Sequence, residues 1–337
     1  MQGSQNRPLR LGDLEAERCK EQAPLSAFAP AAAASILASG RQAGIERYRA
    51  VLNTIVSILF DGLAWAMFLF IISVGLSVTM GLMGVVNLAH GAFAMAGGYL
   101  VMTATASWGV PFLASLVITF LVVACVSVLF ERTLYAQLYG ASELDQVLLT
   151  IGLAFMAIAT YTYFYGPLPQ AIHVPDYLLG EVHLGARSFP TYRVFLIVVG
   201  AALVAALWYG FERTNMGAKI RATVDNRRMA QSVGIDVDRL FTFTFAIGSG
   251  LAALGGGLAI QLLGLTPSFA VIYLVFFLLV VAVGGSGSMW GTLAAALALG
   301  ICDTAGKYLF ADAGSFAIYA VAVLILLIKP AGLYGRE

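Results

Sequence analysis

Residues 81–98, GLMGVVNLAHGAFAMAGG, interrupt a long hydrophobic segment with glycines and polar side chains. The residues that break the apolar helix are Gly81, Gly84, Asn87, His90 and Gly91. Backbone that opens inside a bilayer persists only where it is buried in protein or lines a cavity. Polar residues at such a depth mark a functional site by default. The stretch therefore predicts a polytopic protein that moves a solute across a membrane.

The composition supports a membrane protein. The chain has 337 residues, of which 60% are hydrophobic and 11% are charged, and its mean hydropathy is +0.87. A soluble domain carries about 25% charged residues, so this chain must contact a lipid bilayer. The net charge of +1 is spread over short loops, which gives no reason to expect nucleic-acid binding. Cys19, Cys125 and Cys302 lack metal or disulfide spacing, and we interpret them as packing residues.

Nine apolar runs approach the roughly 20 residues that a transmembrane helix requires. They cover residues 52–80, 85–106, 111–130, 146–165, 192–210, 241–263, 269–284, 289–310 and 314–329. The first run is longer than one crossing and contains Asp61-Gly62, where we expect an interruption. The sequence predicts an all-α, polytopic integral membrane protein of eight or nine transmembrane helices, with broken helices at the bilayer centre.

The first 50 residues differ from the rest because they are rich in charge and contain an alanine-rich stretch. We expect residues 1–50 to form a weakly ordered tail with a short helix over residues 12–22. They are not a secretory signal, since acidic residues precede a short apolar part. Residues 51–337 are expected to form the membrane domain.

Loop charges set the expected orientation. The loop 211–240 contains six of the 19 basic residues, so we expect it to be cytoplasmic, with segment 166–191 outside and the C-terminus inside. Nine spans would place the N-terminal tail outside, which we favour because long tails translocate despite their charge. Eight spans would place the tail inside, as its arginines suggest.

The external segment 166–191 alternates apolar and polar residues in two short runs. Ile172–Val174 and Glu181–Leu184 predict a small hairpin. His173 and His183 fall within these runs, and we interpret them as solvated loop residues because no further ligands accompany them. No metal site and no cofactor are expected.

A second glycine-rich break follows the run 269–284 and precedes a helix of small residues. Its candidate residues for a translocation pathway are Gly285, Ser286 and Ser288, which join Gly81, Gly84, Asn87, His90 and Gly91 of the first break. Paired glycine-interrupted segments in the two halves of a transporter indicate the substrate pathway. The alternative is ordinary close packing, since small residues are common where membrane helices meet.

The loop segment 214–235 predicts a polar helix with a narrow apolar stripe. Thr214 or Asn215 can cap its start, and Gly234 can close its end. The stripe consists of Met216, Ile220, Val224 and Met229. Such a stripe with basic flanks favours docking into a groove of a soluble partner. A solvated loop helix near anionic headgroups is the alternative.

Three ordered motifs resemble the permeases of branched-chain amino-acid ABC importers. They are residues 81–93, the Arg-Ala, Met-Ala and Gly-Ile pairs of segment 221–235, and residues 245–256. The likeness covers residues 51–335 and includes the closing residues 329–335. Within that family the chain is similar to the subunit that pairs with a second, related permease. The permeases of urea and short-amide importers share the same motifs.

The resemblance implies a subunit in the bacterial inner membrane that translocates branched-chain amino acids. It also implies two cytoplasmic ATPase subunits, a second related permease and a periplasmic solute-binding protein as partners. Segment 214–235 would be the ATPase-coupling element, through Gly217, Arg221, Ala222, Asn226, Met229, Ala230 and Gly234. Urea, short amides and small carboxylic acids remain open as substrates. The charged tail departs from the family, whose members mostly start close to the first membrane helix.

Two other classes of protein share single features with this sequence. An ion-coupled secondary transporter needs carboxylates within the membrane, and only Asp61 and Asp303 qualify. We favour paired or interfacial charges for both. Gly284–Gly287 matches the serine loop of an intramembrane protease, but the three histidines all precede it, whereas such enzymes place the base after the serine. No phosphate-binding loop is present, so the chain cannot bind ATP by that mechanism, and the energy must come from a partner or an ion gradient. The chain is expected to have no catalytic residues and not to be an enzyme.

Overall fold

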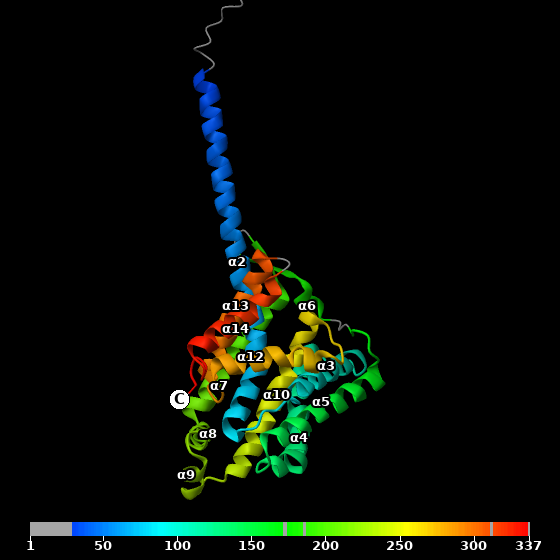
Figure 1. The fold of residues 1–337 in the computed structure, drawn as a ribbon. Coiled ribbons are helices and arrows are strands. Elements are labelled where there is room, and N and C mark those ends of the chain that lie inside the picture. Colours follow the sequence, from blue (N-terminus) through cyan, green and yellow to red (C-terminus); the bar gives the residue numbers. More distant parts are fainter. Residues whose placement is uncertain (1–28, 171–173, 185–186, 311–312, 336–337) are drawn as a thin grey trace, which may run out of the picture. The chain divides into compact units, whose positions relative to one another are not determined.

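The computed structural model describes residues 29–170, 174–184, 187–310 and 313–335. The chain divides into two units, residues 1–57 and 58–337. In the first unit, the described part is helical from Ala29 onward, within the predicted tail. The predicted helix over 12–22 lies outside the described residues. Among the described residues, all the other elements of secondary structure lie in the unit 58–337 (Figure 1).

Helices dominate the described chain, with one two-stranded sheet. The longer helices are α2 (Ala29–Met83), α3 (His90–Ala106), α4 (Phe112–Phe130), α5 (Glu143–Tyr165), α7 (Thr191–Arg213), α8 (Asn215–Asp225), α10 (Val237–Leu263), α12 (Leu274–Gly284), α13 (Met289–Leu309) and α14 (Ala317–Ile328). The shorter elements are η1 (Glu131–Tyr135), η2 (Ala136–Leu138), α6 (Asp176–Leu179), β1 (Glu181–Leu184), β2 (Arg187–Pro190), α9 (Arg227–Ser232), α11 (Phe269–Ile272) and η3 (Gly314–Phe316).

The predicted all-α membrane fold is confirmed. Within the described residues, six helices are long and apolar enough to cross a bilayer. The remaining predicted spans are shorter helices: α3 has 17 residues, and residues 269–284 and 314–328 form shorter apolar helices. The prediction of an interruption at Asp61-Gly62 is wrong, because α2 passes through it unbroken. Gly62 instead lets α13 approach, since a Cβ at Gly62 would lie 2.9 Å from the Cα of Ile301.

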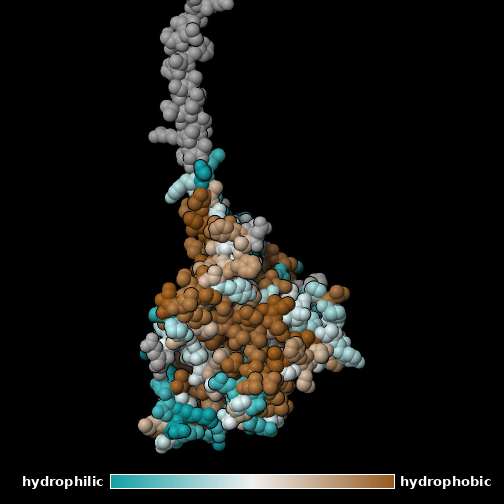
Figure 2. All heavy atoms as spheres, in the orientation of Figure 1, coloured by the Kyte–Doolittle hydropathy of each residue, from teal (hydrophilic) through white to brown (hydrophobic). Residues whose placement is uncertain are grey.

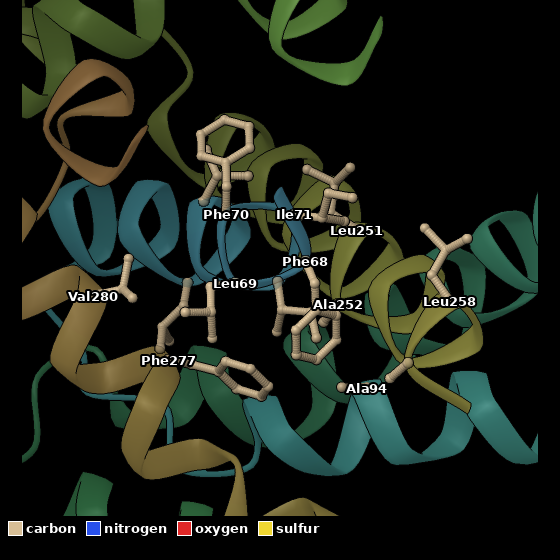
Figure 3. Packing of buried hydrophobic residues seen from close by; sticks show 14 of the residues in the cluster. Phe68, Leu69, Phe70, Ile71, Ala94, Leu251, Ala252, Leu258, Phe277 and Val280 are labelled. Carbon is tan, nitrogen blue, oxygen red and sulfur yellow. The ribbon is translucent and has the colours of Figure 1, made fainter. Parts of the chain in front are cut away.

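The centre of the unit 58–337 is α10, which packs closely against α3 and α4. Small residues make this approach possible: a Cβ on Gly97 would overlap the backbone of Ala253, and one on Gly256 would overlap that of Ala94. Larger apolar side chains of α2 and α12, including Phe68 and Phe277, fill the space beside α10 (Figure 3). Close helix contacts through small residues are the common solution in membranes, where lipid is as apolar as the core.

The outer helices present apolar side chains on the surface. Exposed large hydrophobic residues recur along α4, α5, α7 and α14, and Figure 2 shows a hydrophobic surface over much of the unit 58–337. This surface is the one that lipid would cover. The two described cysteines differ in exposure. Cys302 is half-buried, as expected of a packing residue, whereas Cys125 is exposed.

One end of the unit 58–337, which we call the hairpin end, contains the β1–β2 hairpin. Val182 pairs with Phe189 in an antiparallel register. The predicted hairpin is thus half right: Glu181–Leu184 forms a strand, but its partner is β2, its neighbour in sequence. Residues 171–173, including His173, lie outside the described residues. The ring of Phe60 in α2 lies 4.1 Å from that of Phe189, centroid to centroid, so α2 begins its path through this unit beside the hairpin.

The opposite end, which we call the α8 end, contains α8, α9, η1 and η2. The hydroxyl of Thr242 donates a hydrogen bond of 2.7 Å to Glu131, and the guanidinium of Arg227 lies 4.7 Å from the ring centroid of Phe241. Tyr139 also donates to Glu131, and burial together with this bond raises the pKa of Tyr139 far above its usual range. Hydrophilic residues gather at this end (Figure 2). The loop 211–240, predicted to be cytoplasmic, therefore lies at the end opposite the hairpin of segment 166–191, which is predicted to be external.

Candidate functional site

The two glycine-rich breaks meet in the structure. The N–H of Gly287 donates a 2.9 Å hydrogen bond to the carbonyl of Ser77 in α2. A Cβ on Gly81 would overlap the backbone of Gly287, so the two chains touch without intervening side chains. Gly287 has a φ of +81°, a conformation that favours glycine. The residues predicted from paired sequence patterns are thus brought together.

The meeting point of the two breaks lies nearer one end of the unit 58–337 than the other. Asp61 and Gly81 are 20 residues apart in α2, which corresponds to about 30 Å of helix. Gly81 and Gly287 therefore lie towards the α8 end, whereas His90 contacts Ile72 near the middle of this stretch. The chain between Met83 and His90 accordingly runs from the α8 end towards mid-depth. A hydrophobic run shows that a helix is interrupted, but it does not fix the depth of the interruption.

The polar side chains of the first break are buried and bonded. Asn87 accepts hydrogen bonds through Oδ1 from the N–H of Ala89 at 3.0 Å and from the hydroxyl of Tyr135 at 2.9 Å. Nε2 of His90 lies 2.9 Å from the carbonyl oxygen of Ile72 and, as the N–H donor, ties α3 to α2. These contacts hold the break in shape. Tyr135 is a contributor that the sequence did not indicate, since it lies 48 positions from Asn87.

Two further glycines of the first break, Gly91 and Gly84, have different roles. A Cβ on Gly91 would overlap the carbonyl of Ala270, so Gly91 allows α11 to approach α3. Gly84 is exposed and has a φ of +66°, and its N–H donates to the carbonyl of Met80 at the end of α2. Gly84 therefore turns the chain out of α2, as expected of a helix-terminating glycine.

The second break is closed mainly by backbone. The N–H groups of Leu333 and Tyr334 donate to the carbonyls of Val283 and Gly284 at 2.7 and 3.2 Å, which satisfies the open end of α12. Gly285, with a φ of +89°, lies against the same C-terminal segment. Ser288 caps α13, because its hydroxyl accepts from the N–H of Gly291 at 3.0 Å. The side chain of Ser286 is exposed.

The segment predicted as one polar helix forms two. Thr214 caps α8 by accepting from the N–H of Gly217 at 3.1 Å, whereas Asn215 lies inside the helix. Asn226 ends α8 and caps α9, because its Oδ1 accepts from the N–H of Met229 at 3.0 Å. Asn favours caps over helix interiors, which explains the break. Gly234, with a φ of +88°, follows α9 and ends this segment as expected.

The surface of α8 and α9 is mixed. Met229 is 63% exposed and Val233 is 77% exposed, while Ala230 is buried. Arg221 and Ala222 are exposed, and Arg221 lies 3.7 Å from Glu212. Gly217 packs under α7, since a Cβ there would overlap the carbonyl of Phe211. The exposed methyl groups among basic residues form a surface suited to a protein partner.

Val224 connects this surface to the breaks. A Cβ placed on Gly287 would lie 3.4 Å from Cγ1 of Val224, and 3.1 Å from the Cα of Gly81. The last turn of α8 thus lies directly against the point where the two breaks meet. An apolar cavity of about 460 Å³ lies beside the same elements and is lined by residues of α2, α4, α7, α8 and α10.

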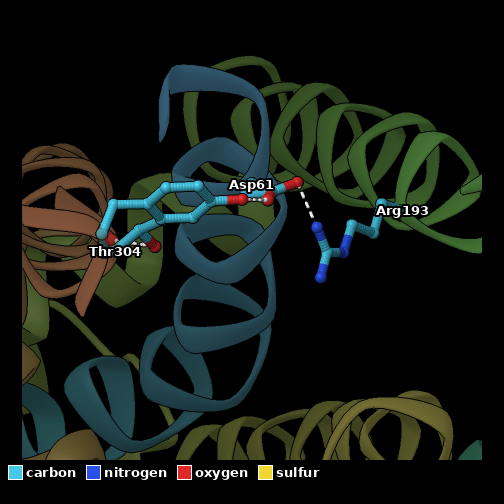
Figure 4. A network of polar contacts seen from close by, with 5 residues as sticks. Asp61, Arg193 and Thr304 are labelled. Carbon is cyan, nitrogen blue, oxygen red and sulfur yellow. Dashed lines mark hydrogen bonds and ion pairs between the residues drawn. The ribbon is translucent and has the colours of Figure 1, made fainter. Parts of the chain in front are cut away.

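The two carboxylates considered for ion coupling are paired at the hairpin end. Asp61 forms an ion pair with Arg193 of α7 and accepts a 2.7 Å hydrogen bond from the hydroxyl of Tyr308 (Figure 4). Asp303 lies 2.6 Å from the ammonium of Lys307. The preferred interpretation of paired charges agrees with these contacts. Arg193 and Tyr308 were not identified from the sequence, where no local motif links them to Asp61.

The described residues contain no group of three histidine, cysteine or acidic side chains that could hold a metal ion. His183 is exposed in β1. His90 contacts Ile72 rather than Ser286, so no serine–histidine pair is seen among the described residues.

Comparison with known proteins assigns the family. The family described as branched-chain amino acid transport system, permease component, matches residues 58–328. The chain belongs to this permease family. Its matched range begins at the first residue of the unit 58–337. The family is one of transport components rather than of enzymes.

Individual relatives of the permease are similarly distant. The high-affinity branched-chain amino acid transport system permease protein BraD of Pseudomonas aeruginosa is 25% identical over 291 residues, covering 82% of this chain and 95% of BraD. The corresponding LivH protein of Escherichia coli K12 is 25% identical over 293 residues, covering 82% and 94%. PsaBC from Streptococcus pneumoniae, solved in complex with Fab, matches 80% of this chain and 89% of its own with 17% identity and a TM-score of 0.45, which is too distant to support a conclusion.

Proposed function

We propose that this permease is the translocating subunit of a binding-protein-dependent ABC importer of branched-chain amino acids in a bacterial inner membrane. The proposal combines family membership over residues 58–328 with the relatives' printed role in branched-chain amino acid transport. Residues 1–50 would be a tail outside the transport machinery, and residues 51–337 the permease domain.

The observation that carries the mechanism is the closeness of Val224 to the meeting point of the two breaks. Gly287 lies close to both Val224 and Gly81, and its N–H is hydrogen-bonded to the carbonyl of Ser77. A displacement of α8 would therefore reach both breaks through backbone that has no side chain to absorb it. Packed interiors convert small shifts into discrete rearrangements rather than gradual deformation.

The exposed surface of α8 and α9 would receive a cytoplasmic ATPase subunit. Two such subunits, a second related permease and a periplasmic solute-binding protein would complete the importer. ATP binding would close the ATPases and move α8–α9, which would shift the population of the permease between outward-facing and inward-facing states. The permease itself would perform no covalent chemistry.

The pathway residues would be Gly81, Gly84, Asn87, His90, Gly91, Gly285, Ser286 and Ser288. In this scheme Asn87 and His90 shape the first break rather than bind the solute, because Oδ1 of Asn87 and Nε2 of His90 are already hydrogen-bonded within the protein. The coupling residues would be Gly217, Arg221, Ala222, Asn226, Met229, Ala230 and Gly234. Of these, Met229 offers the largest exposed apolar side chain to the partner.

Reconstitution tests the proposal. The permease is purified from native membranes in mild detergent, its partners are identified, and the complex is placed in proteoliposomes with the binding protein. We expect leucine uptake to require ATP on the side of the membrane that carries the ATPase subunits. A non-hydrolysable ATP analogue should stop this uptake. Uptake of urea or a short amide instead would reassign the substrate. Recovery of the chain alone, with ATP-independent uptake driven by an ion gradient, would contradict the proposal.

Val224 gives the matching variant. Val224→Ala removes the side chain that reaches Gly287, and we expect ATP hydrolysis to continue while uptake per ATP falls severalfold. Ala218→Gly, at an exposed position of the same helix outside the proposed coupling residues, is the control. Equal coupling in Val224→Ala and the wild type would show that the contact does not transmit the motion.

A further inference from the structure

A polar cavity lies at the hairpin end, away from the two breaks. Its volume is about 280 Å³, close to the lower limit of about 300 Å³ for small-molecule pockets. Charged side chains from three helices line it: Asp61 of α2, Arg193 of α7, and Asp303 and Lys307 of α13. The sequence presents these residues as separate paired charges, but the fold gathers them around one space.

The charges of the cavity balance. Two carboxylates and two cationic groups face a single volume, so their formal sum is zero. A ligand with one positive and one negative group can exchange with these ion pairs without leaving a buried charge uncompensated. An anion or a cation alone would leave one side unpaired, which is costly away from water. The arrangement therefore favours a zwitterion over an ion of either sign.

The cationic groups are accessible for a carboxylate. The side chain of Lys307 is 51% exposed and that of Arg193 is 36% exposed. The carboxylate of Asp303 lies 2.6 Å from the ammonium of Lys307, and its side chain is only 2% exposed. Asp303 therefore orients the ammonium group from the buried side. A guanidinium carries five N–H donors in a fork that suits a carboxylate. Lys307 and Arg193 are the groups that a carboxylate ligand would meet.

Asp61 is the carboxylate placed to receive an ammonium group. Its two oxygens contact Arg193 and the hydroxyl of Tyr308, as Figure 4 shows. A carboxylate accepts about four hydrogen bonds, so these contacts orient Asp61 and leave it capacity to accept from a ligand. Asp61 is thus a positioned acceptor at the edge of the cavity.

An apolar wall stands beside the charges. Trp65, Leu262 and Leu263 line the same cavity, and the ammonium of Lys307 lies 5.6 Å from the ring centroid of Trp65. The indole nitrogen of Trp65 is buried and is one of the side-chain atoms in the described chain without a hydrogen-bond partner. A cavity with charged groups on one side and aliphatic and aromatic surface on the other matches an apolar α-amino acid.

We propose that this cavity is a binding site for the zwitterionic form of an apolar amino acid at the hairpin face of the permease. Arg193 and Lys307 bind the carboxylate, Asp61 binds the ammonium group, and Trp65, Leu262 and Leu263 contact the side chain. The inference rests on the proposed function, because that function makes an amino acid the solute. It adds a selective site within the permease itself, which a solute meets before the breaks.

Equilibrium binding tests the site. The purified complex of the permease with its partner permease and ATPases is placed in nanodiscs without the solute-binding protein, and binding of radiolabelled L-leucine is measured. Two analogues compete: 4-methyl-2-oxopentanoate lacks the ammonium group, and 3-methylbutylamine lacks the carboxylate. We expect leucine to bind and each analogue to bind about tenfold or more weakly, as for the loss of one charge-assisted hydrogen bond.

Two variants separate recognition from structure. Lys307→Gln should weaken leucine binding by about tenfold or more and leave the amine unaffected. Asp61→Asn should reduce the preference for leucine over the oxo acid, because the carboxylate of the oxo acid would then meet Arg193 without competition from Asp61. Asp176→Asn, which alters an exposed carboxylate near the hairpin, is the matched control and should change neither. Assembly and ATP hydrolysis of each variant show that it is folded.

Absence of leucine binding to the wild type, or variants that lower all three affinities equally, would overturn the inference and leave the charges as a structural lock. Uptake by the whole importer separates this outcome from a failure of the proposed function. ATP-dependent leucine uptake together with no leucine binding in nanodiscs would reject the site alone. Uptake of another solute class, with leucine binding absent, would reject both.

Discussion

The two breaks of the permease solve the same problem by different means. The first is held by buried side chains: Asn87 accepts from Tyr135, and His90 contacts the carbonyl of Ile72. The second is held by main chain, because the N–H groups of Leu333 and Tyr334 satisfy the end of α12. In both cases the opened helix avoids unpaired polar groups, which membranes tolerate poorly.

The difference suggests a division of labour. Side chains locked in a packed interior fix a single arrangement, so the first break resembles a hinge anchor. The second lies beside Val224 and depends on a C-terminal segment with few buried side chains. A short segment held by main-chain bonds can shift as a unit, which is what a moving element requires. We therefore expect perturbation of the first break to affect folding as well as transport, and perturbation of the second to affect mainly transport.

The largest effect is expected where the breaks touch. Gly81→Val places a branched side chain against the backbone of Gly287, where even a Cβ would overlap. Overpacking of this kind costs about 1–3 kcal/mol, and here it forces the two breaks apart. We expect ATP-dependent uptake to fall by about fivefold or more, since 1–2 kcal/mol corresponds to a factor of about 5–30 in an equilibrium. Radiolabelled uptake in proteoliposomes measures it.

Gly152→Val is the control for that variant. Gly152 lies in α5, and a Cβ there would meet nothing within 4 Å. Its expected effect on uptake is small. If Gly81→Val transports at the wild-type rate, the contact between the breaks has no part in transport. That result would contradict the proposed roles of the two breaks.

The first break is tested through its histidine. His90→Leu removes the hydrogen bond to Ile72 and should lower the free energy of unfolding by about 1–3 kcal/mol, with a matching loss of expressed permease and of uptake. His183→Leu, in the exposed strand β1, should be neutral. Thermal unfolding in detergent and uptake are measured for both. Normal expression and uptake in His90→Leu would show that this bond does not support the break.

The second break is tested by shortening the chain. Deleting residues 333–337 removes the two hydrogen bonds to Val283 and Gly284, each contributing about 0.5–1.5 kcal/mol. We expect a modest fall in melting temperature but a clear loss of uptake, in contrast to His90→Leu. Deleting only residues 336–337 keeps both bonds and should change neither quantity. A large loss of stability with proportionate loss of uptake would erase the proposed contrast between the breaks.

The smallest effect is expected at the cap of α13. Ser288→Ala removes the hydroxyl that accepts from Gly291, and an N-cap of this type contributes about 1 kcal/mol. Ser286→Ala alters an exposed neighbour and should cost under about 0.5 kcal/mol. Chemical or thermal unfolding of the two variants side by side gives the difference. Equal stabilities would mean that the cap contributes little in this setting.

Several elements follow from sequence because their causes are local. Hydrophobic runs of bilayer length predict α4, α5, α7, α10 and α13, and glycine with polar residues predicts both breaks. The capping residue Thr214 and the terminating Gly234 were likewise identifiable from the chemistry of helix ends. Such features depend on a few neighbouring residues, whose preferences act before any long-range contact forms.

Other expectations failed where a distant partner changed the outcome. Asp61-Gly62 was expected to break α2, but Asp61 is neutralised by Arg193 and Gly62 is needed for the approach of Ile301. A helix can thus carry a charge and a glycine when tertiary contacts use both. By contrast, the prediction of a single polar helix over 214–235 was wrong for a local reason, because Asn226 caps a second helix.

The sequence by itself determined that this chain crosses a membrane and where its helices are interrupted. These properties depend on composition and short-range pattern. Only the tertiary structure decided that Gly81 meets Gly287, that Tyr135 supports Asn87, and that Tyr308 reaches Asp61 across 247 positions of sequence. Contacts between residues so far apart depend on how the helices pack, and no local pattern encodes that packing.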